Sequence, residues 1–514
     1  MKFNLLYIIE EPKDEFCFNY IEDLSIDRTV KIICPDITIA ENAIKILSKP
    51  LFKKENIIYR RELINEFTEK PTLLDELYNA LIKYDDIRRN KEQSKRQVIF
   101  VIKKINDTAA KNLAAFKEMQ LNSNFAEMVL NSLKSIYDIL KANSVKSEAL
   151  LNIRQYCHSI IDNPSVMELK TLLNEIAMMD TENTTFQVIV GFDENLHIHD
   201  VKINKIKFEL PKFSEVLSEP RKIRFFKKQK IEYVDERISV PINFQTIETT
   251  DILSRYAIGE LTYVIEEISN GIYQSLYEVS KELIFYKFAR RYRDFINENN
   301  IETCLSEVLD DFENVLEYNS LSDLFLICSE LSSYGMHSVV ANDVLLPNDI
   351  KGALIKGKNN SGKTVFLRSI GIAQIFAQSG LSVTALSARV SIRNGIYTQF
   401  SAAEEKFIAG DVSGRFEAEV KEINEIIKNI KPNSLILLNE TFQTTAFDEA
   451  ADGMKDILEF ITDLKGKWIF VTHILQLFEM YREEKGITED VVFLQTSEEE
   501  NKKHKIEKFT LKGL

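Results

Sequence analysis

The sequence predicts a multi-domain protein of class α plus α/β, in which a helical region with a small β-containing insertion precedes a domain of alternating strands and helices. Three observations lead to this prediction. Residues 106–180 contain no Gly and carry apolar residues every three or four positions. Strand-like sequence replaces this pattern over residues 185–245. From about Ser338, short apolar strands alternate with helical segments, which is typical of a mainly parallel sheet flanked by helices.

Size and composition limit the classes of protein to consider. A chain of 514 residues should divide into roughly three or four domains of ~150 residues. Its net charge of −14 and pI near 5.2 argue against a simple basic nucleic-acid binder. No run of ~20 apolar residues predicts a membrane span. Five scattered cysteines without a CxxC motif indicate buried thiols in a reducing, cytoplasmic setting: Cys17, Cys34, Cys157, Cys304 and Cys328.

The first half of the chain is predicted from its periodicity. Residues 1–105 should mix short strands and helices, including a helix within residues 37–51 that ends before Pro50. Residues 106–184 should be helical. A β-hairpin with its turn at residues 193–195 should open the insertion.

A long helix is predicted to begin near Asp251. Over ~45 residues it would reach about 65 Å. A helical arm that runs out to an insertion and back is a lever-like layout, although a packed helical bundle without a mechanical role fits the same pattern. The apolar residues follow a heptad-like stripe: Leu261, Ile265, Ile268, Ile272, Leu276, Val279, Leu283 and Tyr286.

Residues 357–364 match the phosphate-loop pattern G-x-x-x-x-G-K-[ST] without a mismatch. An apolar strand precedes them and an apolar helix follows, so backbone N–H groups and the helix N-terminus would face phosphates. Lys363 would bridge the β- and γ-phosphates of ATP, and the Thr364 hydroxyl would hold Mg²⁺. The predicted cofactor-binding residues are Gly357, Lys358, Asn359, Asn360, Ser361, Gly362, Lys363 and Thr364.

Two further strand ends supply candidate catalytic residues. Residues 434–440 read SLILLNE, an apolar run that ends where an acidic pair is usual. Here Asn439 takes the first position, so it could contact Mg²⁺ or its water without adding charge. Glu440 stands where a general base would polarise the attacking water, although it could also simply end a strand. His473 follows the buried strand at residues 468–471 and could sense the γ-phosphate or be structural.

The segments GKNNSGKT, SLILLNE and FVTHILQL, in this order and spacing, resemble the ATPase domain of the MutS mismatch-repair family. Looser similarity extends over most of residues 20–480, including PLFKKENIIYRRELINEF. The resemblance implies an ABC-type ATPase, a homodimer with composite ATP sites, lever helices and a DNA-gripping clamp. The implied domains are a core start at 1–105, a helical lever at 106–184, a clamp-like insertion at 185–245, returning lever helices at 246–335 and the ATPase at 336–514.

Several departures from the family pattern are visible. Only residues 1–20 precede the similarity, so we expect no mismatch-reading domain. The segment GDVSGRFEAEVKEINEIIK resembles the signature that contacts the neighbouring subunit's nucleotide, but Gly414 stands where the family has Ser. Ser413 is therefore the candidate for that contact. ETFQTTAFDEA replaces a more Gly-rich loop, and Thr444, Thr445 and Asp448 are candidates for its subunit-contact role.

DNA contact requires basic surface residues. One cluster falls in the insertion, and a second lies at residues 88–96; ordinary solvated charge explains either cluster equally well. His197 and His199 lack further nearby ligands, so no zinc site is predicted. ATP and Mg²⁺ are the predicted cofactors. The candidate DNA-binding residues of the insertion are Arg221, Lys222, Arg224, Lys227, Lys228 and Lys230.

Three functions remain open from the sequence. The first is a MutS-like ATPase that grips DNA, in mismatch repair or recombination control. The second is an ATP-dependent dimer that acts on proteins or unusual DNA outside mismatch repair. The third, motivated by Asn439, is a nucleotide-binding scaffold with weak or lost hydrolysis.

Overall fold

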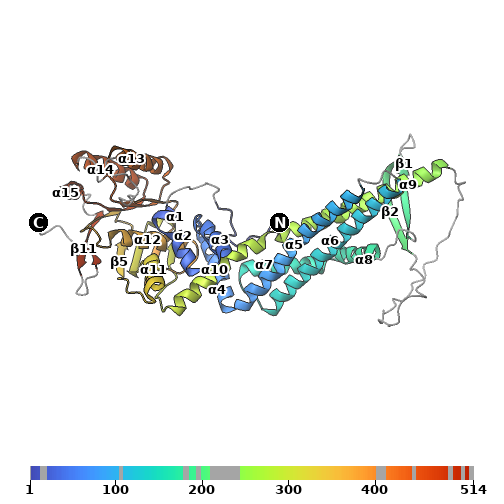
Figure 1. The fold of residues 1–514 in the computed structure, drawn as a ribbon, viewed down its shortest axis with the longest axis horizontal. Helices are drawn as coiled ribbons and strands as arrows, with labels where there is room; N and C mark the ends of the chain where they lie inside the picture. The colour runs from blue at the N-terminus through green and yellow to red at the C-terminus, as the bar shows by residue number, and fades with distance from the viewer. Residues whose placement is uncertain are drawn as a thin grey trace. The chain divides into compact units, whose positions relative to one another are not determined.

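The computed structural model describes residues 2–11, 20–102, 108–177, 184–192, 198–208, 244–400, 412–442, 447–483, 490–498 and 504–508. The chain forms two compact units, each built from separate stretches of sequence (Figure 1). The helical unit comprises Met1–Phe3, Glu76–Ser144 and Asn152–Ser280. The sheet unit comprises Asn4–Asp75, Val145–Leu151 and Lys281–Leu514. Within the described parts of the chain, no helix has both the length and the apolarity needed to cross a membrane.

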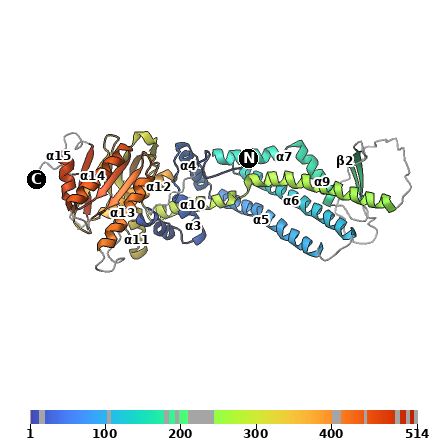
Figure 2. The same ribbon diagram turned by 90° about the horizontal axis from the view of Figure 1, so that it is seen from above.

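Long helices dominate the helical unit, and Figure 2 shows α5, α6 and α9 running along one another. The rings of Tyr84 on α5 and Tyr273 on α9 stack with centroids 5.0 Å apart, and Tyr84 Oη donates to the Ile272 carbonyl at 3.1 Å. Aromatic stacking and this buried hydroxyl contact therefore join α5 to α9. The helices are α5 (Pro71–Ile102), α6 (Thr108–Ala142), α7 (Glu148–Ile161), α8 (Pro164–Ala177) and α9 (Phe244–Leu276).

The predicted hairpin is present. Strand β1 (Thr184–Phe192) pairs antiparallel with β2 (Ile198–Phe208). Its predicted turn at residues 193–195, and most of the insertion beyond residue 208, lie outside the described residues.

The prediction of one long helix from Asp251 was wrong at both ends. Helix α9 starts earlier, at Phe244, and α10 (Val279–Glu298) is a separate helix. Between them Glu278 has φ 68°, a left-handed conformation that ends a helix. Ile268 of the predicted stripe is 42% exposed, whereas Ile265 and Leu276 are fully buried.

A six-stranded sheet in the order β12-β11-β6-β10-β9-β8 forms the centre of the sheet unit. Its described pairings are parallel except that β12 runs antiparallel to β11, so the predicted mainly parallel sheet is confirmed. The strands are β6 (Gly352–Lys356), β8 (Ile396–Phe400), β9 (Leu435–Asn439), β10 (Lys467–Val471), β11 (Val491–Glu498) and β12 (His504–Lys508).

Helices cover both faces of this sheet (Figure 1). Alternate strand residues face opposite sides, so Leu437 joins one apolar cluster and Leu438 the other. Helix α12 (Lys363–Gln378) packs on the first face. On the second face lie α13 (Val412–Asn429), α14 (Phe447–Asp463) and α15 (Leu475–Glu483).

Amino-terminal helices complete the first face. Its cluster extends from Tyr20 to Val492, and a Cβ added to Gly371 of α12 would meet Leu24 at 2.6 Å and Leu437 at 3.0 Å. Residues 2–11 and 20–102 hold helices and no strand, which corrects the prediction of short strands there. These helices are α1 (Tyr20–Asp23), α2 (Ile26–Ile33), α3 (Ile37–Leu47) and α4 (Lys54–Glu69).

A four-stranded sheet in the order β3-β7-β4-β5 also belongs to the sheet unit. Three of the thiols, at Cys34, Cys157 and Cys328, are buried and free, and Cys304 is half-buried. The remaining elements are β3 (Glu307–Leu309), the 3₁₀ helix η1 (Asp311–Glu313), β4 (Leu316–Leu321), α11 (Leu324–Tyr334), β5 (Asn342–Leu346) and β7 (Ser387–Ser391).

Candidate phosphate-binding site

The predicted phosphate loop connects β6 to α12, at the carboxyl edge of the parallel sheet. Gly362 caps the helix with φ 87°, a conformation that glycine adopts without steric cost. Asn360 is also left-handed, with φ 59°. The loop therefore turns tightly and leads its backbone into the positive end of a 16-residue helix.

Lys363 lies inside this loop. Its side chain is 4% exposed, and Nζ donates to the carbonyl oxygens of Gly357 at 2.8 Å and Lys358 at 2.9 Å. Burial lowers the pKa of Lys363, and the Glu440 carboxylate 3.7 Å away opposes that shift. An ammonium held by two neutral carbonyls is a group that a phosphate oxygen could recruit.

The two predicted catalytic residues lie together at this loop. Glu440 follows β9, and His473 follows β10, the neighbouring parallel strand. His473 Nε2 is 3.3 Å from Glu440 Oε1 and 3.5 Å from Lys363 Nζ. Two strand ends and the first residue of α12 thus bring a carboxylate, an imidazole and an ammonium to one point.

The two residues predicted to bind Mg²⁺ also meet. Thr364 Oγ1 donates to Asn439 Oδ1 at 3.3 Å, and Asn439 is 6% exposed. Both supply neutral oxygens, and the described residues contain no cluster of three His, Cys, Asp or Glu side chains that could hold a metal. A cation here would depend on phosphate oxygens and water for most of its ligands.

Ser361 provides a test of whether the loop fits a phosphate. Its hydroxyl is buried, and it has no hydrogen-bond partner among the described residues. A buried hydroxyl without a partner costs free energy, which a ligand oxygen would recover. The orphaned Ser361 hydroxyl, the carbonyl-bound Lys363 and the helix N-terminus together fit a polyphosphate.

A pocket of about 400 Å³ opens beside the loop. Thr496 of β11 lies so close to Gly357 that a Cβ on that glycine would meet Thr496 Oγ1 at 2.2 Å. Local sequence patterns do not indicate that β11 lies beside the loop, because its pairing with β6 joins distant segments. The pocket is lined by Lys356, Gly357, Lys358, His473, Leu475, Gln495 and Thr496.

The turn after β9 carries residues that the sequence did not single out. Glu440 and Phe442 adopt φ of 60° and 62°, an uncommon conformation for residues other than Gly. The Phe442 N–H donates to Glu419 Oε2 of α13 at 2.9 Å, and Thr441 Oγ1 donates to Gln399 Oε1 of β8. Only tertiary structure reveals these contacts, since the partners lie far apart in sequence.

Several other candidates lie outside the structural description. Ser413 belongs to the first turn of α13 and Asp448 to α14, but the positions of their side chains are not described. Thr444 and Thr445 fall outside the described residues, as do His197 and the candidate DNA-binding residues of the insertion, Arg221, Lys222, Arg224, Lys227, Lys228 and Lys230.

The second basic cluster is largely paired with acidic residues. Lys91 lies 2.9 Å from Glu266 and is 9% exposed. Lys95 lies 2.8 Å from Glu118. A lysine paired with a carboxylate offers less charge to a DNA phosphate. For Lys91 and Lys95 the structure therefore favours ordinary paired charge over DNA contact.

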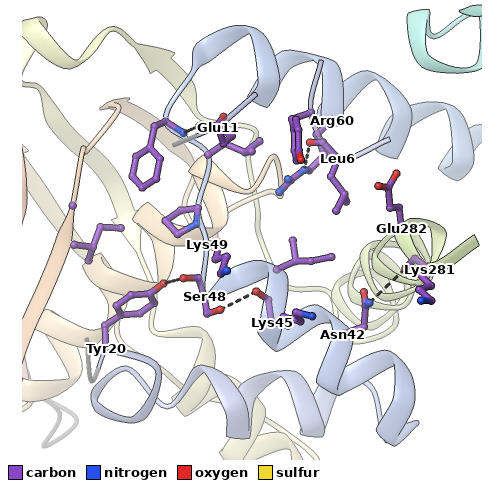
Figure 3. Close-up of a pocket in the computed structure, with 17 residues that line it drawn as sticks. Leu6, Glu11, Tyr20, Asn42, Lys45, Ser48, Lys49, Arg60, Lys281 and Glu282 are labelled. Carbon is purple, nitrogen blue, oxygen red and sulfur yellow. Dashed lines mark hydrogen bonds between the residues drawn. The ribbon is translucent and has the colours of Figure 1, made fainter. Parts of the chain in front are cut away.

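A second cavity, of about 410 Å³, lies in the sheet unit between α3, α4 and the start of α10 (Figure 3). Its polar groups are largely used within the protein: Arg60 Nε donates to the Leu6 carbonyl at 3.1 Å, and Glu11 accepts from the Phe52 N–H at 3.1 Å. Glu11 and Tyr20 both line it, and residues 12–19 between them lie outside the described part of the chain. We assign this cavity no ligand.

Comparison with known proteins agrees with the resemblance seen in the sequence. Residues 353–511 match the family model of MutS domain V. Proteins named DNA mismatch repair protein MutS from Finegoldia magna and Petrotoga mobilis are both 26% identical over 84% of this chain, covering 50% and 52% of their own lengths. The corresponding protein of Streptococcus thermophilus is 33% identical over 28% of this chain and 16% of its own length. The chain spans about half the length of the first two relatives. With a matched MutS domain and relatives that extend across most of its sequence, the chain is similar to members of the MutS family.

Proposed function

We propose that the chain is a MutS-like, ATP-dependent DNA-binding protein. In this proposal it binds and hydrolyses ATP with Mg²⁺ in an ABC-type domain, at sites shared between two copies of the chain. Nucleotide state then drives a DNA clamp, in mismatch repair or in recombination control. The observation that supports it best is the meeting of Lys363, Glu440 and His473 at the phosphate loop.

The roles follow from these positions. Lys363 would exchange its two loop carbonyls for the β- and γ-phosphate oxygens. Glu440 would orient the attacking water and accept its proton, and His473, 3.3 Å from that carboxylate, would contact the γ-phosphate. Mg²⁺, held by Thr364 and near Asn439, would neutralise charge on the phosphate oxygens.

Support for DNA as the partner comes from the relatives, which are named DNA mismatch repair proteins. Because the chain spans only half of those relatives, their activity as whole proteins is proposed here, not transferred. Support for a composite site comes from the likeness of the segment around Ser413 to the family signature. A second copy would bring this segment to the phosphate loop of the first.

Asn439 favours a second candidate function, an ATP-dependent dimeric scaffold with weak or lost hydrolysis that acts on proteins or unusual DNA. An amide at this position adds no negative charge near the cation, so the site would bind Mg²⁺ less tightly than a site with Asp.

Phosphate release measured with and without homoduplex, mismatched and branched DNA tests the proposal. We expect ATP turnover that requires Mg²⁺ and whose rate differs with and without DNA. We also expect the affinity for DNA to fall as the salt concentration rises. Lys363→Ala should abolish turnover, while Lys428→Ala, at an exposed position of α13, should not. Turnover that no DNA alters, without DNA binding, contradicts the DNA-clamp function. ATP binding without turnover supports the scaffold.

A further inference from the structure

The turn that carries Glu440 is strained and is held from outside. Residues 440 and 442 are Glu and Phe, yet both have φ near 60°, where an L side chain costs of order 1–2 kcal/mol. Such a conformation persists only when surrounding contacts hold it in place. The Glu440 N–H is fixed by the Val471 carbonyl at 2.8 Å, which anchors the first half of the turn to β10.

The second half of the turn is anchored to α13. The Phe442 N–H donates to Glu419 Oε2 at 2.9 Å, and Glu419 is 5% exposed. A hydrogen bond to a carboxylate oxygen is stronger than one to a neutral acceptor, and burial removes competing water.

A second, indirect link joins the same turn and helix. Thr441, which is fully buried, donates to Gln399 Oε1, and Gln399 Nε2 donates to Glu422 Oε2 of α13 at 3.4 Å. Both links end on one helix, so a shift of α13 acts on the backbone on the carboxyl side of Glu440.

We propose that Glu419 is a positioning residue that couples α13 to Glu440. This inference rests on the proposed ATPase function. Helix α13 carries Ser413 in its first turn, and Glu419 follows six residues later, about 9 Å along the axis. A helix contacted at its start by a second copy of the chain would thereby set the position of the carboxylate that activates water. Glu419 acts through the turn and touches no reacting atom.

The experiment compares Glu419→Ala and Glu419→Gln with Glu425→Ala, a control on the same helix whose carboxylate is 54% exposed. We expect Glu419→Ala to lower kcat about 10-fold, because a partly misplaced carboxylate orients the attacking water less well. The Kd for a fluorescent ATP analogue should change less than about 2-fold, since the phosphate loop is untouched. Glu419→Gln should restore most of kcat, because its amide oxygen can still accept from Phe442 N–H.

Hydrogen exchange of the peptide containing residues 440–442 provides a readout that does not depend on turnover. Exchange should be faster in Glu419→Ala than in the wild type, and unchanged in Glu419→Gln and Glu425→Ala. A kcat of Glu419→Ala equal to that of the wild type overturns the inference. So does a parallel loss of ATP affinity and thermal stability, which indicates a merely structural role. If the wild-type protein has no ATP turnover, the proposed hydrolysis is wrong, but hydrogen exchange still tests the role of Glu419. Unchanged exchange of residues 440–442 in Glu419→Ala would show that Glu419 does not anchor the turn.

Discussion

Thr364 Oγ1 lies 3.3 Å from Asn439 Oδ1, so the hydroxyl that follows the phosphate-loop lysine meets an amide where a carboxylate would bring charge. The hydroxyl donates to the amide oxygen. Their pairing places Asn439 directly at the proposed Mg²⁺ position.

Asn439→Asp should increase the affinity of the site for Mg²⁺. A carboxylate adds a negative charge and a harder ligand beside Thr364. We expect the Mg²⁺ concentration for half-maximal ATP turnover to fall about 10-fold, which corresponds to roughly 1.4 kcal/mol. Asn424→Asp, at an exposed position of α13, controls for added charge. An unchanged Mg²⁺ dependence in the Asn439 variant would show that this residue does not act on the cation.

Glu440→Gln should separate binding from hydrolysis. If Glu440 accepts the proton of the attacking water, its amide variant should lose about 10²–10³-fold in kcat. The affinity for an ATP analogue should remain within a few-fold, because Lys363 keeps both loop carbonyl contacts. Phosphate release and analogue fluorescence measure the two quantities. Glu459→Gln, on the exposed side of α14, is the control, and undiminished turnover in Glu440→Gln would exclude it as the base.

Two glycine substitutions should shift stability in opposite directions. A Cβ on Gly352 would lie 2.2 Å from the ring of Trp468, which is fully buried between sheet and helices. Gly352→Ala should therefore cost about 1–3 kcal/mol. Gly453 lies within α14 and has nothing within 4 Å of its added Cβ, so Gly453→Ala should stabilise by about 0.5–1 kcal/mol. Thermal unfolding compares them, and equal shifts would contradict the packing argument.

The ion pair between Asp323 and Arg368 should behave as a buried unit. Arg368 Nε on α12 lies 2.8 Å from Asp323 Oδ2, and the carboxylate is 1% exposed. Asp323→Ala leaves the guanidinium unpaired and removes the cap on the Leu326 N–H, so we expect a loss of about 3–5 kcal/mol. Adding Arg368→Met should recover part of that loss. A double-mutant cycle measures the coupling, and strict additivity would show that the pair contributes nothing.

Asp23 should make stability depend on pH. Burial raises its pKa to about 6, with Thr398 Oγ1 donating at 2.7 Å as a partial compensation. An unfolded Asp titrates near 3.9. The folded state therefore holds the Asp23 proton more tightly than the unfolded state does. The protonated Asp23 contributes stability that is fully present below pH ~3.9 and is lost as pH rises through about 6.

Asp23→Asn removes this titration. Its unfolding free energy should exceed that of the wild type by about 1–3 kcal/mol at pH 7. This difference in unfolding free energy, the gap between variant and wild type, should close near pH 4. Denaturant unfolding at the two pH values measures it. Glu41→Gln, at an exposed position of α3, should show no such change in the gap. A gap that is constant with pH would mean that Asp23 titrates normally in the folded protein.

Local patterns in the sequence predicted the strand–loop–helix at residues 357–364, because a tight Gly-rich turn and its flanking apolar runs determine that geometry together. They also predicted β9 and β10, whose carboxyl ends bring Glu440 and His473 to the loop. Parallel strands align their ends, so neighbouring motifs in such a sheet meet even when they are far apart in sequence.

Contacts between distant segments could not be predicted in this way. Glu419 reads as one of many acidic residues on an amphipathic helix, and only the fold shows that it holds the Phe442 N–H. Similarly, the apolar periodicity predicted one helix through residue 276 and beyond. Periodicity does not reveal the left-handed backbone at Glu278, which separates α9 from α10. Lys91 belongs to a basic cluster in the sequence, and only the fold shows that Glu266, 175 residues away, lies beside it.

Leu24 packs against Gly371 and, through it, reaches the strand that holds Leu437. During synthesis the ribosome must therefore add more than 400 residues before Leu24 can be covered by this strand. Until then the amino-terminal helices expose an apolar surface, which makes the nascent chain a candidate client for chaperones. The same dependence means that a fragment beginning at residue 353 would keep α12 but lose the amino-terminal helices that pack on the same face of its sheet, and would be prone to aggregate.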